Sequence, residues 1–315
     1  MRDPAKNRQT TSSMKPLILA LLGALALGES AHAQDRITLG WGRLFVNDAI
    51  GDGEDRWRTG AYTVSILRGT GWSGALPQTF GDLLEIRLRG ETIAPANLVR
   101  AAPGDRRYVG ALSLGLHSHF DLAGNEASLG GDLVFTGPQT GVSRFQDWAH
   151  DVLDMEDPQV FGDQIGNGIH PTLSAEIGRN LPLGNRVTLR PFAAAQAGVE
   201  SLVRVGGDLV FGGFGTGAMM LRDSTTGQRY RAIESDRIEG FSFTLGADFA
   251  RVFDSEYLPE GEPAVLSDTR SRVRAGVHWQ GQRTSVFYGL TWMGKEFEDQ
   301  PDNQVVGALN LNLNF

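Results

Sequence analysis

Apolar and polar residues alternate with a period of two along much of the chain, which is typical of β-strands with two different faces. The last segment, VVGALNLNLNF, shows this most clearly, because Leu309, Leu311 and Leu313 are each separated by an asparagine. The same alternation occurs in LLEIRLRG, FSFTLGADF, RVRAGVHW and TSVFYGLTWMG, with apolar residues on one face and mostly polar or charged residues on the other. The pattern therefore predicts an all-β protein.

Twelve segments of this kind can be counted, and an even number suits a single-chain up-and-down barrel. They are residues 36–48, 59–69, 83–95, 107–121, 125–138, 169–181, 186–200, 202–217, 240–253, 269–280, 283–296 and 304–315. If the first strand starts in the periplasm, connections after odd-numbered strands face the exterior. The long segments 139–168 and 254–268 lie on that side, whereas the compact segments 181–184 and 280–282 lie on the other, as in outer-membrane barrels.

The N-terminal region has the features of an exported protein. Lys15 precedes the apolar run PLILALLGALALG, and AHA at residues 31–33 is a small-x-small cleavage site. The run is shorter than the ~20 residues of a membrane-spanning helix, which disfavours the alternative of an uncleaved anchor. We predict an extension and cleaved signal peptide at residues 1–33, followed by a single domain at residues 34–315.

Alternation alone does not distinguish a membrane barrel from a secreted β-sandwich, whose apolar faces would point inward. The signal peptide, the aromatic C-terminal residue Phe315 and the 41 glycines favour a transmembrane antiparallel β-barrel. The expected location is the outer membrane of a Gram-negative bacterium, with the apolar faces against lipid. The C-terminal strand ending at Phe315 also predicts recognition by the barrel-assembly machinery.

Composition removes several other classes of function. The chain has no cysteine, so it has no disulfide and no thiolate metal site, and any metal must bind oxygen or imidazole ligands. The net charge of −8 and the absence of a long run of basic residues disfavour a nucleic-acid partner.

One segment of the long 139–168 connection has a helical pattern. In VSRFQDWAHDVL, Phe145, Trp148 and Val152 recur at helical spacing, and Gln146 and His150 share another face. We predict a short helix in an outer loop. An imidazole with a pKa near ~6.5 can accept a proton from water at neutral pH, so His150 is a candidate general base. The alternative is an ordinary solvated loop histidine.

The acidic stretch VNDAIGDGEDRWRTG, residues 46–60, invites comparison with a calcium loop. Counted from Asp48 as an EF-hand, position 3 is Ile50 and position 12 is Thr59, where a glutamate is needed. The stretch is therefore no EF-hand, and its acidic, glycine-rich tip is expected to be only a loop.

Several short motifs, taken in order, resemble those of the lipid A 3-O-deacylase family of outer-membrane β-barrels. They are Asn47-Asp48, DRWRT at 55–59, GDR at 104–106, GPQTGVSRFQDWAH at 137–150 and DQIGN at 163–167. No single motif is distinctive, but their order and spacing cover nearly the whole mature chain. One departure is Arg100, which stands where the family usually has lysine, and a planar guanidinium is not equivalent to a compact ammonium.

The resemblance implies hydrolysis of the 3-linked acyl ester of lipid A, the membrane anchor of lipopolysaccharide, with calcium as cofactor. The base that activates water would be His150, and Gln146 would hold His150 or the water. The implied metal residues are Asp48 and, from the following loop, Glu156. Asn47 and Thr59 would contact the developing oxyanion, and Arg100 would bind a phosphate or the carbonyl oxygen. All these residues flank connections predicted for the outer end.

Two other functions remain open at this stage. A noncatalytic barrel, either a porin-like channel or an inactive family member, would share the strand pattern. A soluble secreted β-sandwich that binds a ligand would require the apolar faces to be buried inside.

Overall fold

The computed structural model describes residues 35–154, 156–234 and 238–313. The predicted signal peptide, residues 1–33, and the terminal Phe315 lie outside the described residues. Within the described residues, no helix is both long enough and apolar enough to cross a membrane.

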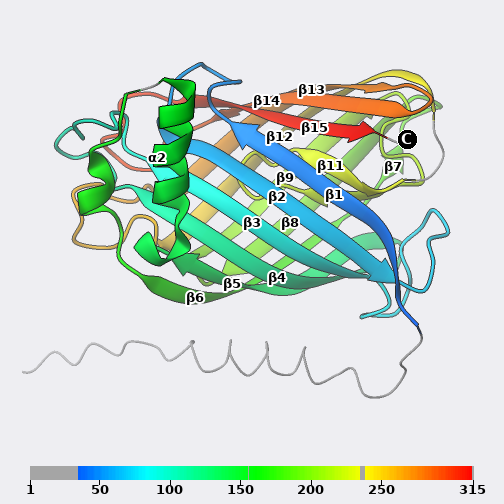
Figure 1. Cartoon of the computed structure of the whole chain (residues 1–315). Coiled ribbons are helices and arrows are strands. Elements are labelled where there is room, and N and C mark those ends of the chain that lie inside the picture. The colour runs from blue at the N-terminus through cyan, green and yellow to red at the C-terminus, as the bar shows by residue number, and fades with distance from the viewer. Residues whose placement is uncertain (1–34, 155, 235–237, 314–315) are drawn as a thin grey trace, which may run out of the picture. The chain divides into compact units, whose positions relative to one another are not determined.

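Twelve antiparallel strands form one closed β-barrel (Figure 1). The thirteenth strand of the sheet, β7 (Leu181–Pro182), pairs only with β8, so it lies outside the circuit. Pairing of β1 with β15 and of β6 with β8 closes the ring. The barrel strands are β1 (Ile37–Asn47), β2 (Trp57–Gly69), β3 (Leu84–Ala94), β4 (Val109–Leu122), β5 (Asn125–Thr136), β6 (Gly168–Gly178), β8 (Val187–Ala197), β9 (Glu200–Phe211), β12 (Gly240–Ser255), β13 (Thr269–Gln280), β14 (Thr284–Met293) and β15 (Gln304–Leu313). The predicted fold class and strand number are confirmed.

The two faces of the wall have the polarity that the alternation predicts. On β12, Phe241, Phe243 and Leu245 are exposed on the outside, whereas Asp248 is buried inside. Arg272 of the neighbouring β13 donates to the Asp248 carboxylate. An apolar outer face and a charged lumen suit a barrel surrounded by lipid, and they exclude the β-sandwich alternative.

Connections at the two ends differ in length, partly as predicted. We call the outer end the one that carries helix α2 (Val142–Leu153). The connections 137–167 and 256–268 lie at this end, and the short connections 123–124 and 281–283 lie at the opposite end. The rule fails elsewhere, because the outer connection 198–199 is short. The 137–167 connection also contains two 3-10 helices, η2 (Pro138–Thr140) and η3 (Val160–Asp163).

A hairpin occupies the lumen, and the alternation pattern does not predict it. It consists of β10 (Met219–Arg222) and β11 (Arg229–Ile233), between β9 and β12. Arg222 pairs with Glu176 of β6 and Asp208 of β9, both at 2.8 Å, and the Tyr230 hydroxyl lies 3.3 Å from Ser65 Oγ of β2. The hairpin therefore bridges distant parts of the wall.

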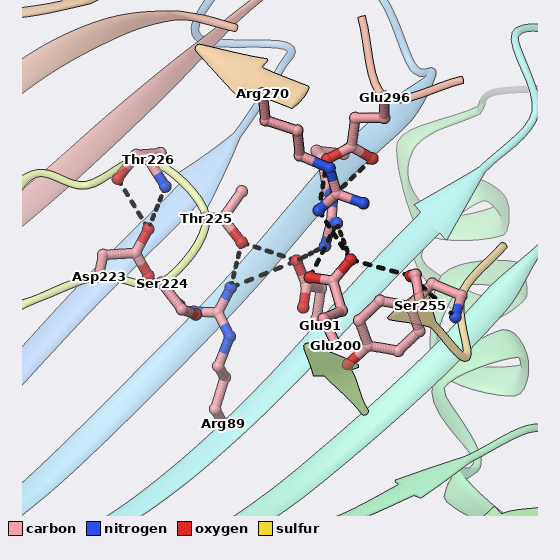
Figure 2. A network of polar contacts seen from close by, with 12 residues as sticks. Arg89, Glu91, Glu200, Asp223, Ser224, Thr225, Thr226, Ser255, Arg270 and Glu296 are labelled. Carbon is pink, nitrogen blue, oxygen red and sulfur yellow. Dashed lines mark hydrogen bonds and ion pairs between the residues drawn. The ribbon is translucent and has the colours of Figure 1, made fainter. Parts of the chain in front are cut away.

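Buried ion pairs fill the lumen near the outer end (Figure 2). The Arg58 guanidinium lies 2.9 Å from Glu296, 3.1 Å from Glu91 and 3.4 Å from Glu200. Arg270 adds a contact of 2.7 Å to Glu200. Because each of these charges has an opposite partner, the group can remain buried without large uncompensated desolvation.

Candidate active site

Helix α2 lies against the outside of the barrel wall at its outer end, in contact with β3 and β4 (Figure 1). It begins after Gly141, whose φ of 72° is a left-handed conformation that favours glycine. Its first residue, Val142, packs on Gly110 of β4, where an added Cβ would lie only 2.8 Å from the Val142 Cβ. The missing side chain at Gly110 thus lets the helix approach the wall. The predicted helix is confirmed with the same bounds.

His150 is buried and holds two hydrogen-bond partners. Its Nδ1 lies 2.8 Å from the carbonyl oxygen of Glu156, and its Nε2 lies 3.1 Å from Oδ2 of Asp55. A carbonyl oxygen can only accept, so Nδ1 carries a proton and donates it. Nε2 then faces the Asp55 carboxylate. The imidazole is therefore oriented from both sides and coupled to an acid.

The environment of Asp55 acts on its pKa in two directions. Burial raises the pKa of the carboxyl, and the neighbouring His150 and Thr59 oppose this without cancelling it. Asp55 comes from the acidic stretch that the sequence analysis expects to be only a loop, and the structure places this loop residue against His150. The DRWRT motif contains Asp55, so the signal was present in the sequence.

A β-bulge places Thr59 beside Asp55. The pairing of β2 with β3 shifts in register between Trp57 and Gly60. Arg58 points into the lumen, where it pairs with three glutamates, so the adjacent Thr59 points to the other side of the wall. The Thr59 hydroxyl lies close enough to Asp55 to lower its pKa, although the two do not form a hydrogen bond of normal geometry.

Several buried polar atoms around this pair have no hydrogen-bond partner among the described residues. They are Oδ1 of Asp55, Oγ1 of Thr59, Oε1 of Gln146 and the hydroxyl of Tyr108. Gln146 lies one helical turn before His150 on the buried face of α2. Buried polar groups are normally satisfied, so four such atoms from neighbouring outer segments indicate a place for a polar ligand.

Asn47 and Asp48 shape the turn after β1. Oδ1 of Asn47 accepts from the Ala49 N–H at 2.8 Å, and Oδ2 of Asp48 accepts from the Arg56 N–H at 2.7 Å. Burial raises the pKa of Asp48 to about 8, and the nearby carboxylates of Asp55 and Asp52 add to the effect, although the Arg56 N–H opposes it. A nearby cation would stabilise the charged form of the Asp48 carboxyl.

The sequence profile of the family described as Outer membrane protein LpxR matches residues 17–315. The chain belongs to the LpxR family. The structure of LpxR from Salmonella typhimurium superposes with a TM-score of 0.73 at 18% identity, covering 88% of this chain and 100% of that one. The NanC porin gives a TM-score of 0.40 at 5% identity, with 88% and 100% coverage. A search of the curated proteins gave no significant match.

The site residues predicted for an LpxR-family protein fall into two groups. The structure brings Asp48, Thr59, Gln146 and His150 to the same end of the barrel as buried side chains, with Asn47 half-buried beside Asp48. Arg100 and Glu156 are exposed on the neighbouring outer loops. These loops are joined, because the Gln159 N–H donates to the Leu98 carbonyl at 2.7 Å. Glu156 contacts His150 through its backbone, which no side-chain pattern could indicate.

Calcium was implied by the resemblance, and the donor set can be compared with what this ion needs. No cluster of three or more His, Asp or Glu side chains that could hold a metal occurs among the described residues. The unsatisfied groups are nevertheless hard oxygens, from Asp55, Thr59 and Gln146, and Asp48 is a buried carboxylate. Calcium takes carboxylate and neutral oxygens together, so the donors fit this ion in kind.

Proposed function

We propose that this chain hydrolyses the 3-linked acyl ester of lipid A at the outer end of the barrel. The observation that carries the proposal is the pair of buried His150 and half-buried Asp55 beside the unsatisfied Thr59 hydroxyl. An oriented imidazole next to free hydrogen-bonding groups is what general-base hydrolysis of an ester requires. Membership of the LpxR family supports lipid A as the substrate and the outer membrane as the place of action.

In the proposed reaction, a water molecule lies between Asp55 and the unprotonated Nε2 of His150. Nε2 takes a proton from this water as the oxygen attacks the ester carbonyl, and the Glu156 carbonyl keeps the ring oriented through Nδ1. The Gln146 amide oxygen accepts the second proton of the water in a hydrogen bond. When the tetrahedral intermediate collapses, the imidazolium returns the proton to the departing 3-hydroxyl oxygen.

In this proposal the remaining predicted residues stabilise the oxyanion, hold calcium and bind a phosphate of the substrate. The Thr59 hydroxyl and the Asn47 amide donate to the oxyanion as it forms. Asp48 would hold calcium, and Glu156 is a second candidate from the adjacent loop. When bound, calcium supplies positive charge that polarises the ester carbonyl. Arg100, on its exposed loop, binds a phosphate of the lipid A headgroup.

The porin-like alternative finds little support in the lumen. The β10–β11 hairpin and the ion pairs around Arg58 cross the interior, and one cavity beside them measures about 270 Å³. An open channel needs a continuous aqueous path, which side chains bridging opposite walls obstruct.

Mass spectrometry of lipid A tests the function directly. Lipid A extracted from cells that express the chain is expected to lack the 3-linked acyloxyacyl group, with this group recovered as a free acid. Purified protein with lipid A in detergent provides the same readout without other cellular enzymes. If lipid A stays intact in both settings with calcium present, the chain is a noncatalytic barrel.

Exchange of Asp55 for asparagine is expected to lower kcat by about 10²-fold, because the imidazole loses the carboxylate that orients it. KM is expected to change little, since Asp55 contacts Nε2 of His150 and does not bind the acyl chain in the proposed reaction. The matched control is Glu54→Gln, which changes an exposed acid of the same loop. Equal activity of the two variants would remove Asp55 from the mechanism.

Removal of calcium by a chelator is expected to reduce hydrolysis by about 10²-fold, the usual effect of losing one oxyanion-stabilising group. Purified protein in detergent is assayed before chelation, after chelation and after calcium is added back. Asp48→Asn is expected to raise the calcium concentration needed for half-maximal activity. Full activity in the chelator, with Asp48→Asn unchanged, would contradict the calcium assignment and leave the hydrolase assignment intact.

A further inference from the structure

Helix α2 presents its apolar side chains away from the barrel. Phe145, Trp148 and Val152 are 65%, 57% and 62% exposed, while Gln146 and His150 on the opposite face are buried. The rings of Phe145 and Trp148 lie 5.6 Å apart and form one patch. A surface helix in water has the reverse arrangement, with its apolar face against the protein. None of the described residues buries this face. It therefore requires an apolar environment in the surroundings of the barrel.

The place of α2 on the wall identifies that environment. Its first residue packs on Gly110, and Leu112 and Leu114 follow on the same outward face of β4. Leu114 is exposed, as are its cross-strand neighbours Leu88 and Leu133. Same-face residues are about 6.6 Å apart along a strand, so this apolar band comes within about 13 Å of the helix. The face of α2 adjoins the surface that the barrel turns towards lipid.

We propose that Phe145, Trp148 and Val152 lie among the aliphatic acyl chains of the leaflet at the outer end, so that α2 is a membrane-interface helix. Amphipathic helices of this kind bury an apolar face at the boundary between headgroups and chains, and tryptophan is enriched at that depth. The inference concerns where α2 lies in the bilayer, and it holds whether or not the ester is cleaved.

The position of α2 has a consequence for access to the site. With one face in lipid, the helix holds His150 on its other face, between the membrane and the barrel wall. A lipid in the leaflet then reaches His150 sideways, without its acyl chains leaving the apolar layer. Under the proposed function, the scissile ester would arrive at the site by this lateral path.

Quenching of tryptophan fluorescence tests the position of Trp148. The full chain is reconstituted into phosphatidylcholine vesicles with or without bromine on the upper part of the acyl chains, and the Trp148 signal is the difference between wild type and Trp148→Phe. We expect brominated chains to quench the fluorescence of Trp148 as strongly as that of Trp41, which is obtained in the same way from Trp41→Phe. Trp41 is the reference because it is exposed on the lipid-facing side of β1. Trp72, whose indole donates to the Gly217 carbonyl, provides the weakly quenched control through Trp72→Phe.

A relocated tryptophan gives a second measurement. In the Trp148→Phe background, Val152→Trp is expected to restore quenching by brominated chains, since Val152 lies one turn further along the same face. If aqueous iodide but not brominated lipid quenches both Trp148 and the relocated tryptophan, the face lies in water and the proposal is overturned. Quenching by neither reagent would mean that protein covers the face, and would overturn it as well.

Discussion

Exchange of His150 for alanine is expected to reduce hydrolysis of lipid A by up to about 10⁴-fold, because the variant loses the group that takes the proton from water. The loss is expected in kcat, and purified protein with lipid A in detergent provides the measurement. Folding is expected to persist, since His150 lies on a helix outside the wall and takes no part in the strand pairing that closes the barrel.

The matched control is Asp147→Ala, on the same helix. Asp147 is exposed, and its replacement removes a charged side chain without touching the Asp55 pair. We expect this variant to keep the activity of the wild type. Activity retained in His150→Ala would exclude His150 as the base, and equal losses in both variants would point to a general effect on α2.

The sequence predicts the barrel because one physical rule governs every strand. Lipid outside and charge inside impose a period of two, and this pattern holds in β12, β13 and β15 without knowledge of their partners. Helix α2 is predicted for a similar reason, because Phe145, Trp148 and Val152 repeat at helical spacing. The structure adds that this stripe faces outward, which is the orientation expected beside lipid and the reverse of that in water.

Features that depend on a single distant contact are not visible in the sequence pattern. In the sequence, Asp55 does not differ from the other acidic residues of its glycine-rich turn. Only the fold brings it within 3.1 Å of His150, which lies on α2. The β10–β11 hairpin is short, and the role of its polar side chains becomes clear only from the ion pairs that they form with the barrel wall. The bulge before Gly60 reverses which side of the wall a residue faces, so strict alternation misplaces Thr59.

The bulge also connects the lumen with the candidate site. Arg58 and Thr59 are adjacent, and they point to opposite sides of β2. The ion pairs of Arg58 with Glu91, Glu200 and Glu296 fix the backbone from inside, and Thr59 faces Asp55 outside. The buried network therefore supports the position of a residue that it does not touch.

Exchange of Arg58 for alanine is expected to lower the free energy of unfolding by about 3–5 kcal/mol, because three buried glutamates lose their shared partner. Urea unfolding in detergent micelles, followed by tryptophan fluorescence, measures the change. Arg251→Ala is the matched control, since the Arg251–Asp268 pair is exposed. Exposed pairs contribute about 0–1 kcal/mol, so equal effects of the two substitutions would contradict the assigned role of the network.

The pH dependence of this loss distinguishes the ion pairs from simple loss of packing. Burial alone would raise the pKa of Glu296, but Arg270, Arg58 and Arg106 reverse this and hold it well below the usual range. The charged form thus stabilises the wild type above the ordinary glutamate pKa of 4.5, and this contribution declines as the pH falls below that value. In Arg58→Ala the glutamates accept protons more readily, which relieves their repulsion. We therefore expect the gap in unfolding free energy between wild type and variant to narrow with acidification, whereas a gap due to packing alone would not depend on pH.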